Sequence, residues 1–292
     1  MVQLGFNAKG TLDTDAQVAY ARAMLDAMSP AARSRIHVRV TGGTRSQTEI
    51  GRHWEKSQLD AWIGLQDDYG IGLVFVVNGN DPPAAQAQFV QRWIDGGATF
   101  SFLEMMNEYY LPRYRNGDTS FEEVTKQVTA ESYTTEILPA YMAALSRFGL
   151  PMFVIAAPEK GNPELAAWND TIVSAFAAHA DWAGVTVHLY ETGATFDYAQ
   201  IDALRARLPP GTPIAITECG VTDESITSYA QAAERFAAHE RTVLSFLKPG
   251  DYLFDQVLYL NGADKYFTAT LHPSSGGLTE KGAAIVDLFE SP

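Results

Sequence analysis

Two glutamates, Glu108 and Glu218, have the type and the position that acid and nucleophilic catalysis require. Each closes an apolar run typical of a β-strand, residues 101–107 for the first glutamate and residues 213–217 for the second. Two carboxylates that converge in one cleft can supply the acid and the nucleophile of glycosidic bond cleavage. Whether these two converge depends on the elements that carry them.

The two glutamates stand 110 positions apart in a chain of 292 residues. If the chain were eight repeats of strand and helix, each repeat would take about 36 residues, which is usual for a barrel of this kind. The separation is then close to three whole repeats. Both carboxylates would therefore lie at the same end of one barrel, after the fourth and the seventh strands.

Strand and helix patterns alternate along the whole chain. The sequence predicts strands at residues 2–6, 36–41, 72–77, 99–106, 152–156, 184–190, 214–218 and 253–260. It predicts helices at residues 15–28, 48–65, 83–94, 121–147, 163–178, 198–207, 229–246 and 281–289. Asn162 followed by Pro163 is typical of a helix start. We predict an α/β fold, a (β/α)8 TIM barrel that forms a single domain over residues 1–292.

An open, doubly wound sheet would also alternate strands and helices. Two features of the sequence argue against it. No G-x-G-x-x-G motif follows the first strand, and no low-complexity linker or shift in composition divides the chain into halves. The closed barrel is the better interpretation.

Acidic side chains outnumber basic ones, with 35 Asp and Glu against 21 Lys and Arg and a formal net charge of −14. Such a field repels nucleic acids and anionic membrane surfaces and suits neutral sugars better than phosphates. We expect no nucleic-acid partner, no membrane partner and a monomer. Because Cys219 is the one cysteine, no intrachain disulfide can form.

The sequence leaves the cellular location open. Its first residues enter an apolar strand directly, without the basic segment and apolar stretch of a signal peptide. No apolar run approaches the length of a membrane span. The protein would be secreted if a signal peptide had been removed.

The fourth strand carries one charged residue, Glu104, which shares a side with Glu108 if the strand is regular. A charge inside an apolar strand must be paired or have polar neighbours. We interpret Glu104 as an ion-pair member in the barrel floor, with Arg39 as a candidate partner. Asn107 suits either a hydrogen bond to a sugar hydroxyl or a loop cap.

The sixth strand places three polar side chains on one side, Thr186, His188 and Tyr190. A polar inward face near the carboxyl end of a barrel strand is typical of an active-site lining, although His188 alone would suit a buried structural histidine. The second strand repeats the pattern with Arg39 on its polar side. A cation close to a carboxylate keeps that carboxylate ionised, which a nucleophile requires.

These motifs, in this order, resemble the clan A retaining glycoside hydrolases: Asn-Glu after strand four, His-x-Tyr in strand six and Thr-Glu in strand seven. The resemblance covers the whole chain at the level of strand order. It implies that Glu108 is the acid/base and Glu218 the nucleophile. It also implies substrate-binding roles: Asn107 at the sugar 2-hydroxyl, Tyr190 at the nucleophile, and Arg39 and His188 lining the −1 subsite.

The chain departs from this group in two places. Members often have Trp before Asn-Glu and Pro after it, where this sequence has Met106 and Tyr109. Many place a stacking Trp near the end of strand eight. At that place residues 258–261 of this chain read Leu-Tyr-Leu-Asn, and Asn261 is the last residue of this run. We count Tyr109 and Asn261 as further candidates for substrate binding, with ordinary loop packing as the alternative for Tyr109.

Other chemistries have little support in the sequence. It contains no H-E-x-x-H motif, no cysteine cluster and no G-x-S-x-G elbow, so we expect no metal and no cofactor. We predict a retaining β-glycoside hydrolase that cleaves β-linked poly- or oligosaccharides internally, of glucan, mannan or xylan type. The alternatives are an exo-acting β-glycosidase, a non-catalytic glycan-binding barrel, and a barrel enzyme that uses Glu218 as a proton-abstracting base with Lys160.

Overall fold

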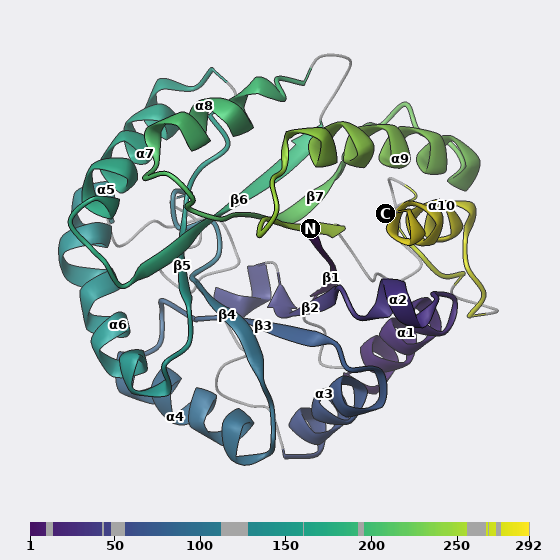
Figure 1. Ribbon diagram of the computed structural model, residues 1–292, viewed down its shortest axis with the longest axis horizontal. Coiled ribbons are helices and arrows are strands. Elements are labelled where there is room, and N and C mark those ends of the chain that lie inside the picture. Colours follow the sequence, from purple (N-terminus) through teal and green to yellow (C-terminus); the bar gives the residue numbers. More distant parts are fainter. Residues whose placement is uncertain are drawn as a thin grey trace.

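Eight parallel strands close into a barrel in sequence order, so the predicted fold class is confirmed (Figure 1). The computed structural model describes residues 1–9, 14–42, 44–47, 56–111, 128–159, 161–191, 196–255, 267, 269–272 and 276–291. The strands are β1 (Gln3–Lys9), β2 (Ile36–Gly42), β3 (Gly72–Val76), β4 (Phe100–Met105), β5 (Met152–Ile155), β6 (Trp182–Glu191), β7 (Ile214–Val221) and β8 (Tyr252–Asp255). Hydrogen bonds between β1 and β8 complete the ring.

Helices surround this barrel on the outside (Figure 1). They are α1 (Thr14–Asp26), α2 (Pro30–Arg33), α3 (Lys56–Tyr69), α4 (Pro83–Asp95), α5 (Ala130–Ser132), α6 (Leu138–Leu145), α7 (Pro163–Phe176), α8 (Ala199–Arg207), α9 (Tyr229–Phe246) and α10 (Glu280–Glu290). Short turns of 3-10 helix cover Thr44–Gln47 and Ser146–Phe148, and a π-helical turn covers Tyr133–Ile137. None of the helices described has the length and apolar character needed to cross a membrane.

Local sequence chemistry explains where these helices begin and end. The predicted start at Asn162 is confirmed, because its side chain accepts a hydrogen bond from the backbone N–H of Glu164 at 2.9 Å. The predicted helix 15–28 corresponds to α1, which ends at Asp26, and a short further helix, α2, follows with Ser29 as its cap. Of the predicted helix 48–65, residues 48–55 lie outside the described residues, and α3 covers the rest and continues to Tyr69, after which Gly70 has a φ of 66°.

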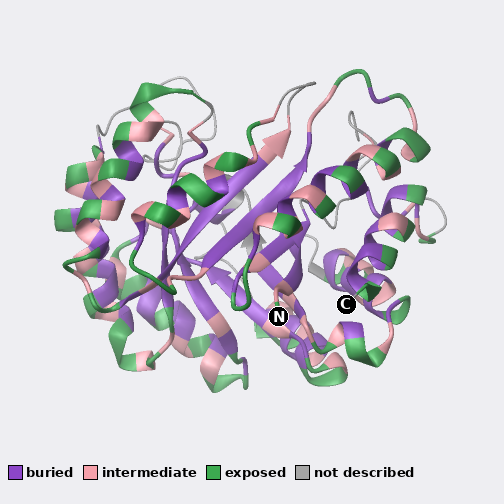
Figure 2. Cartoon of the chain, turned by 45° about the horizontal axis from the view of Figure 1, so that its top comes forward, coloured by how far each residue is buried: buried purple, intermediate pink, exposed green. Residues whose placement is uncertain are grey.

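Two further predicted elements also lie partly outside the described residues. Of the predicted helix 121–147, residues 121–127 fall there, and the described part contains α5, the π-helical turn and α6. Of the predicted strand 253–260, residues 256–260 fall there, and β8 covers the rest. Buried positions concentrate in the strands and on the inward sides of the helices (Figure 2).

The lower part of the barrel interior is filled by aromatic rings. Phe102 and Phe153 stack with ring centroids 4.2 Å apart, and Phe254 packs edge-on against Phe102. Gly5 and Gly184 make room for them, since a Cβ on either glycine would overlap a phenylalanine ring. This aromatic layer lies beneath the polar side chains at the carboxyl ends of the strands, and at the amino ends His37 contacts Ser101 Oγ at 2.7 Å and Gln3 Oε1 at 3.1 Å.

Candidate active site

Glu108 and Glu218 lie at the same end of the barrel, after β4 and near the end of β7, as predicted. The chain leaves β4 abruptly, because Met106 and Glu108 both adopt left-handed backbone conformations, with φ of 77° and 45°. Such conformations are uncommon outside glycine and often occur at functional sites. The side chains of Glu108 and Glu218 are 14% and 11% exposed, so both are mostly buried yet reach the surface of the barrel mouth.

A β-bulge in β7 determines how Glu218 is presented. Ile216 pairs with Val187 of β6, yet the next pair joins Glu218 to His188, so Thr217 is an extra residue. Thr217 and Glu218 both face the barrel interior, where their side chains bond to Glu104 and Arg39. A bulge next to a site commonly redirects a side chain in this way.

Arg39 of β2 is the centre of the polar layer and is wholly buried. Its Nε and Nη2 donate to the two carboxylate oxygens of Glu104 at 2.6 and 2.9 Å, so the predicted ion pair is confirmed. Its Nη1 donates to Glu218 Oε1 at 2.8 Å and to Asn7 Oδ1 at 3.0 Å, and Nη2 also donates to Asn107 Oδ1 at 2.9 Å. Because a guanidinium is planar with fixed donor directions, Arg39 sets the positions of both carboxylates.

The ring of His188 on β6 connects the carboxylates of the site. Its Nδ1 lies 3.2 Å from Glu108 Oε1 and 3.8 Å from Glu218 Oε1, and its Nε2 lies 3.5 Å from Glu104 Oε1. Since the first two distances share one nitrogen, the two oxygens are at most about 7 Å apart, the sum of these distances. Glu108 and Glu218 therefore face a common space.

The charges of these groups shift one another's pKa values. Burial lowers the pKa of His188, but the negative charge of Glu218 and the contacts with Glu104 and Glu108 outweigh it and raise the pKa to about 10. Burial raises the pKa of Glu104, but the positive charge of Arg39 and the contact with His188 lower it below its usual range. Both shifts favour the charged forms, a cation at His188 and an anion at Glu104.

Two tyrosine hydroxyls complete the surroundings of the two glutamates. Tyr190 of β6 donates to Glu218 Oε2, and Tyr110 donates to Glu108 Oε1 at 3.1 Å. Burial, followed by the negative charge of Glu218, raises the pKa of Tyr190 well above its usual value. Tyr190 therefore keeps its proton and remains a donor to Glu218.

The structure brings six of the eight site residues from the sequence analysis together: Glu108, Glu218, Arg39, Asn107, His188 and Tyr190. It does not bring Tyr109 there. That side chain is buried, and its hydroxyl donates to Asn80 Oδ1 at 3.0 Å, because the turn at Glu108 directs Tyr110 to the site instead. Asn261, like Lys160 of the alternative mechanism, lies outside the described residues.

Sequence reasoning missed three polar members of this layer, Asn7, Thr217 and Tyr110. Asn7 could have been found, because extending the first strand by one residue places it on the same side as Gly5. Thr217 depends on the bulge, and Tyr110 depends on the left-handed backbone of Glu108. Neither conformation has a signal in residue types alone.

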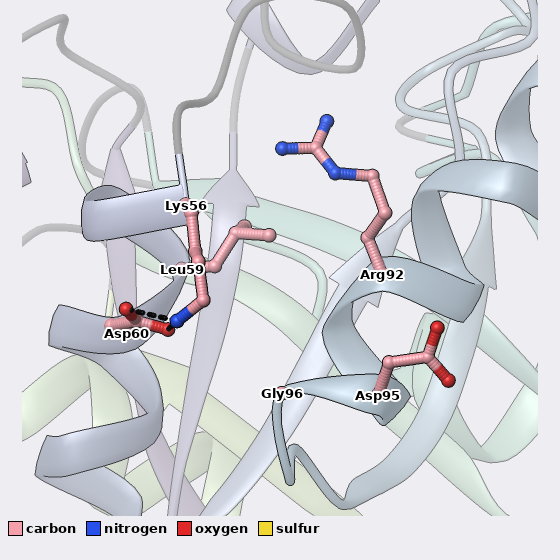
Figure 3. Close-up of a pocket in the computed structure, with 6 residues that line it drawn as sticks. All are labelled: Lys56, Leu59, Asp60, Arg92, Asp95 and Gly96. Carbon is pink, nitrogen blue, oxygen red and sulfur yellow. Dashed lines mark hydrogen bonds and ion pairs between the residues drawn. The ribbon is translucent and has the colours of Figure 1, made fainter.

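Other features of the described residues lie apart from this layer. A pocket of about 230 Å³ lies between α3 and α4, lined by Lys56, Leu59, Asp60, Arg92, Asp95 and Gly96 (Figure 3). Glu191, at the end of β6, pairs with Arg235 at 2.5 Å. Across the ranges that the structure describes, no group of three or more His, Cys, Asp or Glu side chains could hold a metal ion.

Comparisons with known proteins give similarity in fold. No family model matches the chain, and no curated protein matches it in sequence. Among solved structures, a GH128 (subgroup I) endo-beta-1,3-glucanase from Amycolatopsis mediterranei, in complex with laminaritriose, is similar with 17% identity and a TM-score of 0.58. That alignment covers 99% of this chain and 100% of the other.

Two further structures resemble the chain at 99% coverage of its length. An endo-beta-1,4-xylanase of glycoside hydrolase family 10 from Gloeophyllum trabeum has 11% identity, a TM-score of 0.64 and 96% of its own chain covered. A variant GH5_18 protein from Streptomyces cattleya, in complex with Manb1-4GlcNAc, has 14% identity, a TM-score of 0.63 and 80% covered. The similarity to barrels of glycoside hydrolases, predicted from the motifs, is therefore confirmed at the level of fold.

Proposed function

We propose that this chain is a retaining β-glycoside hydrolase and that residues 1–292 act as one catalytic domain. The observation that carries the proposal is the shared contact of Glu108 and Glu218 with one nitrogen of His188. It keeps these two oxygens within about 7 Å of each other, so both carboxyl groups can face one anomeric carbon. We expect a carboxyl separation of about 5–5.5 Å, as in retaining enzymes.

In the first step, Glu108 protonates the oxygen of the leaving sugar while Glu218 attacks the anomeric carbon. The bond from that carbon to the leaving oxygen breaks, and an ester bond to Glu218 forms. Arg39 and Tyr190 donate to different oxygens of Glu218, which orients the carboxylate and favours its ionised form. Within the described part of the chain, both contacts of Glu108 reach Oε1, so Oε2 can carry the proton toward the substrate.

In the second step, Glu108 accepts a proton from a water molecule, which attacks the anomeric carbon and releases Glu218. Asn107 is suited to hold the sugar 2-hydroxyl through both steps. Its Oδ1 accepts from Arg39, which fixes the amide, while its Nδ2 is buried and has no hydrogen-bond partner among the residues described. A buried donor without a partner is costly, and a substrate hydroxyl would satisfy it.

The substrate that we propose is a neutral β-linked polysaccharide of glucan, mannan or xylan type, cleaved internally. Two of the similar structures carry the names of endo-acting enzymes, one on beta-1,3-glucan and one on beta-1,4-xylan. The net charge of −14 also favours a neutral substrate over an anionic one.

The test is a product profile over soluble β-glucans, mannans, xylans and galactans, with NMR detection of the anomeric configuration first released. We expect shorter oligosaccharides with the configuration of the substrate. Glu108→Gln and Glu218→Gln should each lose nearly all activity. Glu191→Gln is the matched control, because this carboxylate also lies at the carboxyl end of a barrel strand but pairs with Arg235.

Three results would overturn parts of this proposal. Products of inverted configuration would refute the two-step mechanism. Loss of activity in Glu191→Gln together with an active Glu108→Gln variant would assign the acid to Glu191. Binding of oligosaccharides without cleavage of any of them would favour a glycan-binding barrel.

A further inference from the structure

Glu104 makes more contacts than an ion pair with Arg39 requires. Besides its two bonds from Arg39, its Oε1 accepts from Thr217 Oγ1 at 3.2 Å and lies 3.5 Å from His188 Nε2. The side chain is wholly buried and does not reach the barrel mouth. It therefore lies behind the site and can act on the reacting groups only through its neighbours.

His188 faces charges of both signs at the Nε2 end of its ring. Nε2 lies 3.5 Å from Glu104 Oε1 and also 3.5 Å from Nη2 of Arg39. The positive charge of Arg39 disfavours a proton on the ring, and burial disfavours it too. Glu104 is the one carboxylate at the Nε2 end within the described contacts, so its negative charge offsets Arg39 there.

We propose that Glu104 is a positioning residue for the acid/base: it holds His188 in place and protonated, with Nδ1 of the ring 3.2 Å from Glu108 Oε1 and 3.8 Å from Glu218 Oε1. This inference rests on the proposed function. It extends the sequence interpretation of Glu104, which assigned it an ion pair alone.

A count of charges shows what this arrangement does in the proposed reaction. Before the first step, Arg39 and His188 are cations, Glu104 and Glu218 are anions, and Glu108 is protonated. When Glu108 gives its proton to the leaving oxygen and Glu218 becomes an ester, one negative charge is lost at Glu218 and one appears at Glu108. The total is unchanged, and in this structure Nδ1 lies 3.8 Å from Glu218, the anion before the step, and 3.2 Å from Glu108, the anion after it.

The first measurement is the titration of His188 in the folded wild-type protein by NMR of its ring nitrogens. The chain has six histidines, and the spectrum of His188→Gln identifies the signal. We expect the ring to stay protonated beyond about pH 8, against about 6.5 for a free histidine. A neutral His188 ring at pH 7 in the wild type would overturn the proposal without any further variant.

The second measurement compares Glu104→Gln with Glu240→Gln, which alters another wholly buried carboxyl, on α9 outside the barrel. We expect His188 in Glu104→Gln to lose its proton at least about two pH units lower than in the wild type, since Arg39 then lacks its counter-charge at Nε2. Glu104→Asp keeps the charge but withdraws it by one methylene, and should give a smaller shift. Glu240→Gln should leave the titration unchanged.

The same variants separate this inference from the proposed function. In Glu104→Gln we expect kcat to fall and the alkaline limb of the pH–rate profile to move, with KM little changed. Equal His188 titrations in the wild type and a folded Glu104→Gln would refute the role of Glu104. If the titration depends on Glu104 but no glycoside is cleaved, the charge arrangement stands and the proposed function fails.

Discussion

Replacing Glu240 by glutamine is expected to stabilise the protein, and to do so more strongly as the pH rises. Glu240 is wholly buried on α9. Its charged neighbours are Asp255 on β8 and Lys281 on α10, whose Nζ binds both oxygens of Asp255 at 2.7 and 2.5 Å. Burial and then the negative charge of Asp255 raise the pKa of Glu240 well above 4.5, although Lys281 lowers it.

The size of the effect follows from proton linkage. A carboxyl with a raised pKa in the folded state favours folding fully below its unfolded pKa, near 4.5, and this contribution is lost as the pH rises toward the folded pKa. Within that window the folded protein holds one proton more than the unfolded chain. The wild type therefore loses about 1.4 kcal/mol of unfolding free energy per pH unit from this group. Glutamine has the shape of the protonated acid and cannot ionise, so the variant lacks this loss.

Urea unfolding of the wild type and Glu240→Gln, in steps from about pH 4.5 to about pH 8.5, measures the difference in unfolding free energy. We expect the two proteins to be nearly equal at the acid end and to diverge with increasing pH. Glu164→Gln, an exposed residue in the first turn of α7, is the control for a change of net charge. A difference between wild type and Glu240→Gln that does not vary with pH would refute the reasoning.

Three further variants test the site and the barrel interior. Glu218→Ala should lose turnover but retain oligosaccharide binding, and azide should restore cleavage of an activated substrate with inverted product configuration; activity without added anion would place the nucleophile elsewhere. Tyr190→Phe should lower kcat by roughly 10–100-fold, because a hydrogen bond to a charged group contributes about 1.5–3 kcal/mol, and unchanged kinetics would contradict this. Gly5→Ala should lower the urea midpoint by the equivalent of about 1–3 kcal/mol, since its Cβ overlaps Phe254; an unchanged midpoint would show that the ring can move aside.

The architecture and the two glutamates could be predicted from the sequence because both depend on periodicity. Apolar strands recur at nearly constant intervals, and a separation of three repeats between Glu108 and Glu218 fixes them to one end of a closed barrel. Alternation along the strand predicts that Arg39, His188 and Tyr190 face the barrel interior. The backbone is regular in these parts of β2 and β6, so the prediction is confirmed there.

The remaining details of the site depend on backbone irregularities that residue types do not encode. The left-handed φ of Glu108 determines that Tyr110, and not Tyr109, bonds to its carboxylate. Arg39 binds both Glu104 and Glu218, and this depends on distances across the barrel between three different strands. Alternation along a single strand cannot supply either.

The bulge in β7 makes chain length, as well as residue type, a determinant of this site. Thr217 and Glu218 together face one residue of β8, Phe254, between the pairs Ile216–Leu253 and Cys219–Asp255. With one residue fewer, regular alternation would return, and one of the two inward side chains would be lost from the interior. Neither substitution of Thr217 nor a change at Glu218 can compensate for such a deletion. Transfer of this site to another barrel would therefore require the one-residue insertion in the seventh strand before any exchange of side chains could take effect.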